Sequence, residues 1–216
     1  MWPGVSKRPV SYVAFLRAVN VGGQGIVTKD ALRDAFTRAG GTSVRTFIQS
    51  GNVLFDAAPA TVEAIVAAAK RRLRPVLGAE PVVIVRRASD IARLLRQGPF
   101  AGVSAPAAIK RYIVFLLKRP VRRPRMPFVS AAERLEAVHV RGRDCWLLSG
   151  RKPSGMYGFP GLFVEKALGV PATARNWSTV TRLAAVLAAP PETNAARPRA
   201  RAPKGAGAAK EPRARA

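Results

Sequence analysis

Blocks of hydrophobic residues with two different periods alternate along the first half of the chain. A continuous apolar run at 12–16 is typical of a buried strand, expected at 12–18, whereas the apolar residues that follow Thr28 recur at the spacing of one helical face. Thr28 is the predicted N-cap of that helix, and Gly40 and Gly41 end it. The elements expected in this half are, in order, strand 12–18, helix 28–39, strand 44–49, strand 52–56, a helix that opens at Pro59, and strand 81–86.

The second half repeats this order with less regular patterning. The strand expected at 111–117 contains Tyr-Ile-Val-Phe-Leu, which is close to the Tyr-Val-Ala-Phe-Leu that begins at Tyr12. Ser130 and Glu133 have the spacing of a capping box and predict the start of a helix. The remaining elements are a hairpin of strands 137–141 and 144–149 that turns at Gly142, helix 162–168, strand 171–175, and a last helix capped by Asn176.

Each half therefore has the order β-α-β-β-α-β, which is the ferredoxin-like arrangement. The predicted fold class is α+β, with two tandem ferredoxin-like units, antiparallel sheets and a C-terminal helix. The expected boundaries are an extension at 1–9, a first unit at 10–87, a linker at 88–109 whose short helix is capped by Ser89, a second unit with its C-terminal helix at 110–189, and a tail at 190–216. The tail has no apolar side chain larger than alanine apart from proline, so it is expected to be disordered.

The chain is strongly basic, with 37 Lys and Arg residues against 12 Asp and Glu residues and a formal net charge of +25. The tail contributes only +5 of this charge. Such an excess favours phosphate-rich partners, so nucleic acid is a candidate partner through the dispersed basic surface and the tail. Arginine outnumbers lysine and alanine is abundant, as GC-rich codon usage alone would produce. A merely basic, solvated surface is therefore the alternative.

No apolar run approaches the roughly 20 residues that a membrane-spanning helix needs. The first residues also lack the charged-then-apolar plan of a secretory signal. A cytoplasmic protein with no membrane partner is expected. Its single cysteine, Cys145, excludes an internal disulfide.

The residue types that carry most catalysis are poorly placed for it. In a hairpin that turns at Gly142, Cys145 is expected on the face of Val138 and Val140, and His139 on the opposite face with Trp146, which argues against a Cys–His nucleophile pair. Cys145 is interpreted as a core residue and His139 as a surface residue. The carboxylates are scattered without a histidine at ligand spacing, so neither a metal nor a cofactor is predicted.

Two loops in the first half are candidates for binding an anion. The glycines of loop 20–25 would let backbone N–H groups approach an anion, and Arg17 or Lys29 could add charge. The alternative is a plain connecting loop. Gln49-Ser50-Gly51-Asn52 is likewise either a hairpin turn or part of a site.

Arg175 is a further candidate because it precedes a helix N-terminus, where a cation is disfavoured. A carboxylate or a bound anion near it would remove the penalty. Asn176 as N-cap and Trp177 as a packing anchor need no ligand. A basic run between Lys118 and Arg125, interrupted by prolines, predicts an extended loop that either follows a phosphate backbone or is simply solvated. The full set of predicted ligand-binding residues is Arg17, Asn20, Gly22, Gly23, Lys29, Arg45, Gln49, Ser50, Asn52, Arg175 and Asn176.

Three segments resemble a known bacterial family, the domain-of-unknown-function 1697 family. They are Tyr12-Val-Ala-Phe-Leu-Arg-Ala-Val-Asn-Val-Gly-Gly23, Val44-Arg-Thr-Phe-Ile-Gln-Ser-Gly-Asn-Val-Leu-Phe55 and Thr173-Ala-Arg-Asn-Trp-Ser-Thr179. The resemblance runs from about Val10 to Leu187. It implies a duplicated ferredoxin-like fold and no particular activity. Several members carry a Ser-Lys pair ahead of the penultimate helix, where this chain has Pro160-Gly161.

The leading functional hypothesis is a cytoplasmic binding or regulatory module without catalysis, for a phosphorylated small molecule or nucleic acid. The alternative is an enzyme that acts on a phosphorylated or carboxylated small molecule, with Arg17, Lys29 and Arg175 as electrostatic stabilisers. A third class is a structural, oligomer-forming protein, and the sequence leaves the oligomeric state open. Any site is expected where the two halves meet.

Overall fold

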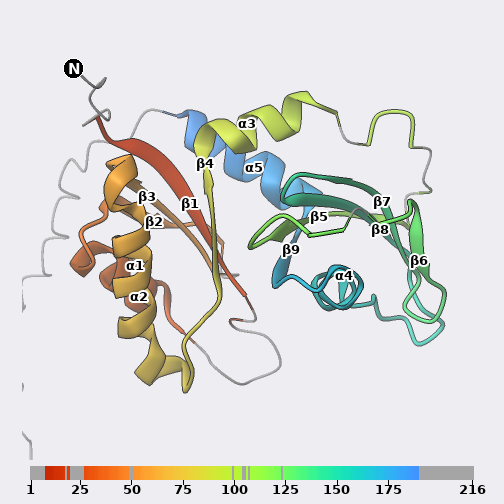
Figure 1. Ribbon diagram of the computed structural model, residues 1–216, viewed down its shortest axis with the longest axis horizontal. Coiled ribbons are helices and arrows are strands. Elements are labelled where there is room, and N and C mark those ends of the chain that lie inside the picture. The colour runs from red at the N-terminus through yellow and green to blue at the C-terminus, as the bar shows by residue number, and fades with distance from the viewer. Residues whose placement is uncertain are drawn as a thin grey trace, which may run out of the picture.

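The computed structural model describes residues 8–17, 19, 27–48, 51–98, 100–103, 106, 108–122 and 124–189. In these residues, two antiparallel sheets and five α-helices form the predicted α+β fold (Figure 1). The tail at 190–216, the glycines of loop 20–25 and the turn residues Gln49 and Ser50 lie outside the described residues.

The first half forms a four-stranded sheet with two helices on one face. Its elements are β1 (Val10–Leu16), α1 (Lys29–Arg38), β2 (Thr42–Thr46), β3 (Asn52–Ala57), the 3-10 turn η1 (Pro59–Thr61), α2 (Val62–Leu77) and β4 (Val83–Arg87). The strand order is β2-β3-β1-β4. Thr28 is the predicted N-cap of α1, and its hydroxyl accepts a hydrogen bond from the backbone N–H of Ala31 at 3.1 Å. The apolar faces of both helices pack on one side of the sheet.

The second half forms a five-stranded sheet with α4 on its outer face. Helix α3 (Ala88–Arg96) links the halves, and the elements that follow are β5 (Lys110–Leu116), β6 (Phe128–Ser130), β7 (Leu135–Arg141), β8 (Asp144–Ser149), α4 (Pro160–Leu168), β9 (Ala172–Asn176) and α5 (Trp177–Ala188). The strand order is β6-β7-β8-β5-β9. Asn176 caps α5 as predicted, with its side-chain oxygen 3.0 Å from the backbone nitrogen of Ser178.

A shared core joins the two halves. The inner faces of both sheets pack together with α3 and α5, which lie side by side across the top of the view in Figure 1. At its centre, Phe15 of β1 and Phe115 of β5 stack with ring centroids 4.3 Å apart. Both sheets are therefore covered on both faces, which explains why their central strands are apolar runs rather than alternating ones.

Three local predictions are wrong. The helix expected at Ser130 is absent from the described residues 117–122 and 124–134, where β6 and a turn stand instead. The Ser130 hydroxyl does accept from the backbone N–H of Glu133 at 3.3 Å, so the capping-box contact forms in a turn that no helix continues. Helix α3 begins at Ala88 with Arg87 at the N-cap position, two residues before the expected cap at Ser89.

The third error concerns the hairpin of β7 and β8. His139 pairs with Trp146 and Val140 with Cys145, as predicted, but the register shifts between Ala137 and His139. This bulge turns Val138 toward the core of Trp146 instead of the core of Cys145. His139 still lies on the face of Trp146, opposite the face of Cys145, as predicted.

Candidate functional site

Arg86 crosses the junction from the first half into the second. It is the penultimate residue of β4 and is only 3% exposed. Its Nη2 donates to the carbonyl oxygens of Leu116 at 3.0 Å and Arg143 at 2.6 Å, and its Nε donates to Oδ1 of Asp144 at 3.1 Å. Its guanidinium lies 5.3 Å from the ring centroid of Phe115. Arg86 therefore holds the ends of β5 and β8 together from the opposite half.

Arg175 makes the corresponding crossing in the other direction. It is the penultimate residue of β9 and is 8% exposed. Its Nη2 donates to the carbonyl oxygens of Leu16 at 3.0 Å and Gly51 at 3.3 Å, and its Nε donates to Oδ1 of Asn52 at 2.6 Å. Its guanidinium lies 5.3 Å from the ring centroid of Phe15. Carbonyl and amide oxygens of the first half thus face the cation where the sequence predicted a carboxylate or a bound anion.

The contacts of Arg86 and Arg175 differ in the charge of the side chain that accepts the hydrogen bond from Nε. Asp144 begins β8 and Asn52 begins β3, so the two residues occupy matching places, but one is a carboxylate and the other an amide. Burial lowers the pKa of Arg175 to about 10, which still leaves the guanidinium charged at neutral pH. Burial also lowers the pKa of Arg86 and raises the pKa of Asp144, because the attraction between them does not fully offset their desolvation.

Of the predicted residues that the structure describes, all but Lys29 are placed at the junction by their contacts or by a shared pocket. Arg17 forms an ion pair with Glu165 of α4 at 2.7 Å, and Arg45 donates to the carbonyl oxygen of Val186 in α5 at 3.3 Å. Arg17, Arg175 and Asn176 line a pocket of about 530 Å³. Lys29 is exposed at the start of α1, while Asn20, Gly22, Gly23, Gln49 and Ser50 lie outside the described residues. The contacts of Arg17 and Arg45 therefore link the two halves.

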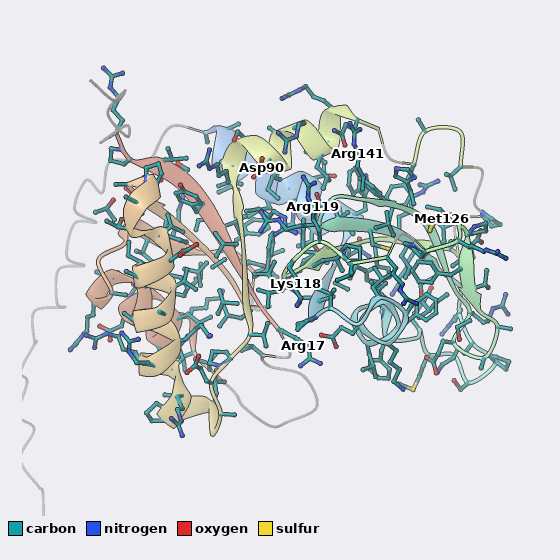
Figure 2. The ribbon with its side chains drawn as sticks, in the orientation of Figure 1. Arg17, Asp90, Lys118, Arg119, Met126 and Arg141 are labelled. Atoms are coloured by element: carbon teal, nitrogen blue, oxygen red, sulfur yellow. The ribbon has the colours of Figure 1, made fainter. Side chains whose placement is uncertain are left out.

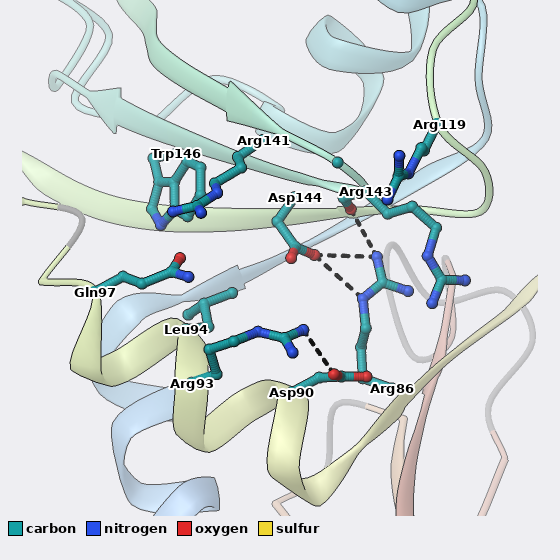
Figure 3. Close-up of a pocket in the computed structure, with 11 residues that line it drawn as sticks. Arg86, Asp90, Arg93, Leu94, Gln97, Arg119, Arg141, Arg143, Asp144 and Trp146 are labelled. Carbon is teal, nitrogen blue, oxygen red and sulfur yellow. Dashed lines mark hydrogen bonds and ion pairs between the residues drawn. The ribbon is translucent and has the colours of Figure 1, made fainter.

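A second pocket at the junction was missed by the sequence analysis and is far richer in charge. It has a volume of about 520 Å³ and lies between α3 and the turn of the β7–β8 hairpin (Figure 3). We call it the arginine pocket, after the five arginines and two aspartates in its lining: Arg86, Arg93, Arg119, Arg141 and Arg143, with Asp90 and Asp144.

The two aspartates of the arginine pocket are already engaged. Asp90 accepts from Arg93 at 2.7 Å, and Asp144 accepts from Arg86, as the dashed lines in Figure 3 show. Among the described residues, no carboxylate lies within ion-pairing distance of the remaining three arginines, Arg119, Arg141 and Arg143, whose residues are exposed. The pocket therefore carries three positive charges that its own aspartates do not neutralise.

One signal in the sequence could have found this pocket. Arg141 and Arg143 flank Gly142 at the predicted hairpin turn, and a turn places its two ends at the same edge of the sheet. Arg119 stands three residues beyond the end of β5, the strand next to β8. The tertiary structure then adds Arg93, because α3 packs against the same edge.

The described residues contain no metal-binding cluster, and neither Cys145 nor His139 is placed to act as a nucleophile–base pair. No group of three His, Cys, Asp or Glu residues suited to a metal is present there. Cys145 is buried, and burial raises the pKa of its thiol to about 12, so the thiolate is not formed at neutral pH. The ring of His139 packs on Trp146, with centroids 5.1 Å apart. In the same residues, no helix has the length and apolar character to cross a bilayer.

The chain belongs to the family described as Protein of unknown function (DUF1697), whose model matches residues 10–146. This confirms the family resemblance; the matched range includes the first two of the three sequence segments, and the segment from Thr173 to Thr179 lies outside it. The fold is similar to that of a solved structure, the conserved bacterial protein SP0830 from Streptococcus pneumoniae, with a TM-score of 0.56. The two share 18% sequence identity, and the match covers 83% of this chain and 99% of that chain. At this identity the similarity concerns the fold alone. Comparison with curated proteins gave no match.

Proposed function

We propose that this protein is a binding module without catalysis, and that it holds an anionic ligand in the arginine pocket. The observation that carries the proposal is the set of three arginines, Arg119, Arg141 and Arg143, that line one concave site without carboxylate partners among the described residues. The formal charge of the whole chain, +25, adds a long-range attraction for anions.

Guanidinium groups suit this role because each presents a planar fork of N–H donors that matches the oxygens of a phosphate or carboxylate. The ion pairs Arg86–Asp144 and Arg93–Asp90 also support the proposal, because they leave neither aspartate as an unpaired negative charge against the ligand. A volume of about 520 Å³ lies within the range of small-molecule sites.

We also propose that the two halves are copies of one ferredoxin-like unit. Strands β2-β3-β1-β4 and β7-β8-β5-β9 stand in the same relative order. Leu16 N–H donates to the Gly51 carbonyl at 2.8 Å, and Leu116 N–H donates to the Arg143 carbonyl at the same distance. In this interpretation, the second copy has replaced its first helix by the loop that carries Arg119, which opens the arginine pocket to a ligand.

The proposal is tested by thermal unfolding at low salt with inorganic phosphate, tripolyphosphate and citrate. We expect at least one of these anions to raise the melting temperature, and the shift to shrink with added salt. Arg143→Ala should reduce the affinity on the order of tenfold or more, because it removes one charge-assisted hydrogen-bond donor. Arg72→Ala is the matched control, since Arg72 is exposed on α2 and outside the pocket.

Two results would contradict the proposal. One is the absence of any shift in melting temperature with all three anions. The other is an equal loss of affinity in Arg143→Ala and Arg72→Ala, which would mean that anions respond only to the net charge of the protein.

A further inference from the structure

An apolar pocket adjoins the arginine pocket and shares part of its wall. It has a volume of about 470 Å³, and Arg119, Arg141 and Gly142 line both pockets. The rest of its lining consists of Pro120, Pro124, Met126, His139 and Val140. Figure 2 labels Arg119 and Arg141 beside α3 and Met126 farther along the same side of the molecule. A ligand that occupies both pockets would pass the two shared arginines.

The apolar pocket offers flat and weakly polar surfaces. The two prolines and Met126 contribute carbon and sulfur atoms, and Met126 is 37% exposed, which is high for a large hydrophobic residue. His139 is exposed on one side, while on the other its ring packs against the buried Trp146 with centroids 5.1 Å apart. The imidazole is therefore held as a supported plane, which is the arrangement on which another ring stacks.

We propose that the ligand is a nucleotide-like molecule, in which phosphate groups are joined to a flat aromatic ring. This inference rests on the proposed function, because the phosphates occupy the arginine pocket. The ring occupies the apolar pocket, in contact with His139 and Met126, and Arg119 and Arg141 lie at the boundary between the two parts. A small molecule fits better than a nucleic acid strand, because each pocket is of small-molecule size and the described residues that line the two pockets offer one exposed, supported ring plane rather than a series of them.

The inference is tested by titration calorimetry in magnesium-free buffer with four probes. These are ATP, tripolyphosphate, adenosine and a single-stranded DNA of twelve nucleotides. ATP should bind on the order of tenfold more tightly than tripolyphosphate, since stacking of one base on an aromatic ring supports a gain of that size. Adenosine should bind more weakly than either, because it cannot use the arginines.

Variants assign the two parts of the ligand to the two pockets. His139→Ala with Met126→Ala should remove the advantage of ATP over tripolyphosphate while leaving tripolyphosphate binding unchanged. Arg143→Ala should weaken both ligands by the same factor, because Arg143 lines only the arginine pocket of the two. Circular dichroism and the melting temperature of each variant check that the fold is retained.

The possible outcomes separate failure of this inference from failure of the proposed function. Equal affinities for ATP and tripolyphosphate would overturn the inference and leave the anion-binding function standing. Another outcome is that the DNA binds more tightly than ATP, with an affinity that falls as the strand is shortened. That result would overturn the inference and identify nucleic acid as the ligand. If ATP does not bind while tripolyphosphate, phosphate or citrate does, only this inference fails; if none of these anions binds, both proposals fail.

Discussion

At each end of the junction, a buried arginine from one half donates hydrogen bonds to the other half, but the side chain that accepts them differs. At one end Arg86 meets the carboxylate of Asp144, and at the other Arg175 meets the amide of Asn52. The hairpins that present these two residues explain the difference. Asn52 begins β3, and its Nδ2 donates to the carbonyl oxygen of Phe47 at 3.0 Å. An amide satisfies both that acceptor and the arginine, whereas a carboxylate has no hydrogen to donate.

The other hairpin imposes no such demand. Arg141 and Asp144 pair directly, so only Gly142 and Arg143 form the turn. In the described residues, no backbone carbonyl near Asp144 needs a donor from its side chain as the Phe47 carbonyl does from Asn52. The Asp144 carboxylate can therefore accept from Arg86 alone. Its side chain is also 25% exposed at the edge of the arginine pocket, while Asn52 is fully buried. The side chain that accepts the hydrogen bond from the arginine is thus fully buried at the Arg175–Asn52 end, whereas at the Arg86–Asp144 end it is charged and partly exposed.

Removal of Arg175 should have the largest effect on stability. Arg175→Met takes a donor away from the Leu16 and Gly51 carbonyls and from the buried Asn52, which water cannot reach. We expect a loss of about 3–5 kcal/mol in the free energy of unfolding, measured by urea denaturation, because several buried acceptors lose their donor at about 1–3 kcal/mol each. Arg72→Met should lose less than about 0.5 kcal/mol as the surface control. A loss at Arg175 no greater than this control would show that the crossing does not hold the halves together.

Removal of Arg86 should cost less, about 2–3 kcal/mol. Arg86→Met leaves the Asp144 carboxylate without its ion pair, but this side chain borders the arginine pocket and can be rehydrated. The same urea experiment measures the difference between the two ends. If Arg86→Met proves more damaging than Arg175→Met, solvent access is not what separates them.

Substitution of Asn52 or Asp144, the side chains that accept hydrogen bonds from the two arginines, should change the stability less, and by different amounts at the two ends. Asn52→Asp adds an ion pair with Arg175 but replaces the donor to the Phe47 carbonyl with a second acceptor. We expect it to lower stability by about 1–2 kcal/mol, whereas Asp144→Asn should change stability by less than about 1 kcal/mol. Stabilisation by Asn52→Asp would disprove the role given to Phe47.

The smallest expected effect is a dependence on pH that comes from Asp144. Burial raises the pKa of this carboxyl in the folded protein, so the folded state holds the proton more tightly than the unfolded state does. The stabilisation from protonated Asp144 is present at low pH and is lost as the pH rises through the raised pKa. Between about pH 4 and pH 7, wild type should therefore lose stability relative to Asp144→Asn.

Urea denaturation of both proteins at the two pH values measures this change. We expect it to stay below about 1 kcal/mol, because the partly exposed carboxylate remains in contact with water. A gain in the stability of wild type over Asp144→Asn as the pH rises would mean that Arg86 outweighs desolvation at this carboxyl.

Much of the fold could be predicted from local patterns. The helix that starts after Thr28 and the helix capped by Asn176 were found because N-caps and helical periodicity act within a few residues. The helix expected at Ser130 was wrong because a capping-box contact stabilises a turn equally well when no apolar face follows it. Val138 was placed on the wrong face because a bulge in β7 has no signature in the residues themselves.

The candidate site divides in the same way. The position of Arg175 and Asn176 between a strand and a helix was enough to predict a cation at a helix N-terminus and an N-cap beside it. The identity of the oxygens that meet Arg175, and the placement of Arg119, Arg141 and Arg143 around one pocket beside α3, depend on the tertiary structure. The physical reason is that caps and turns depend on neighbours along the chain, whereas the two crossings and the arginine pocket depend on contacts between residues from opposite halves.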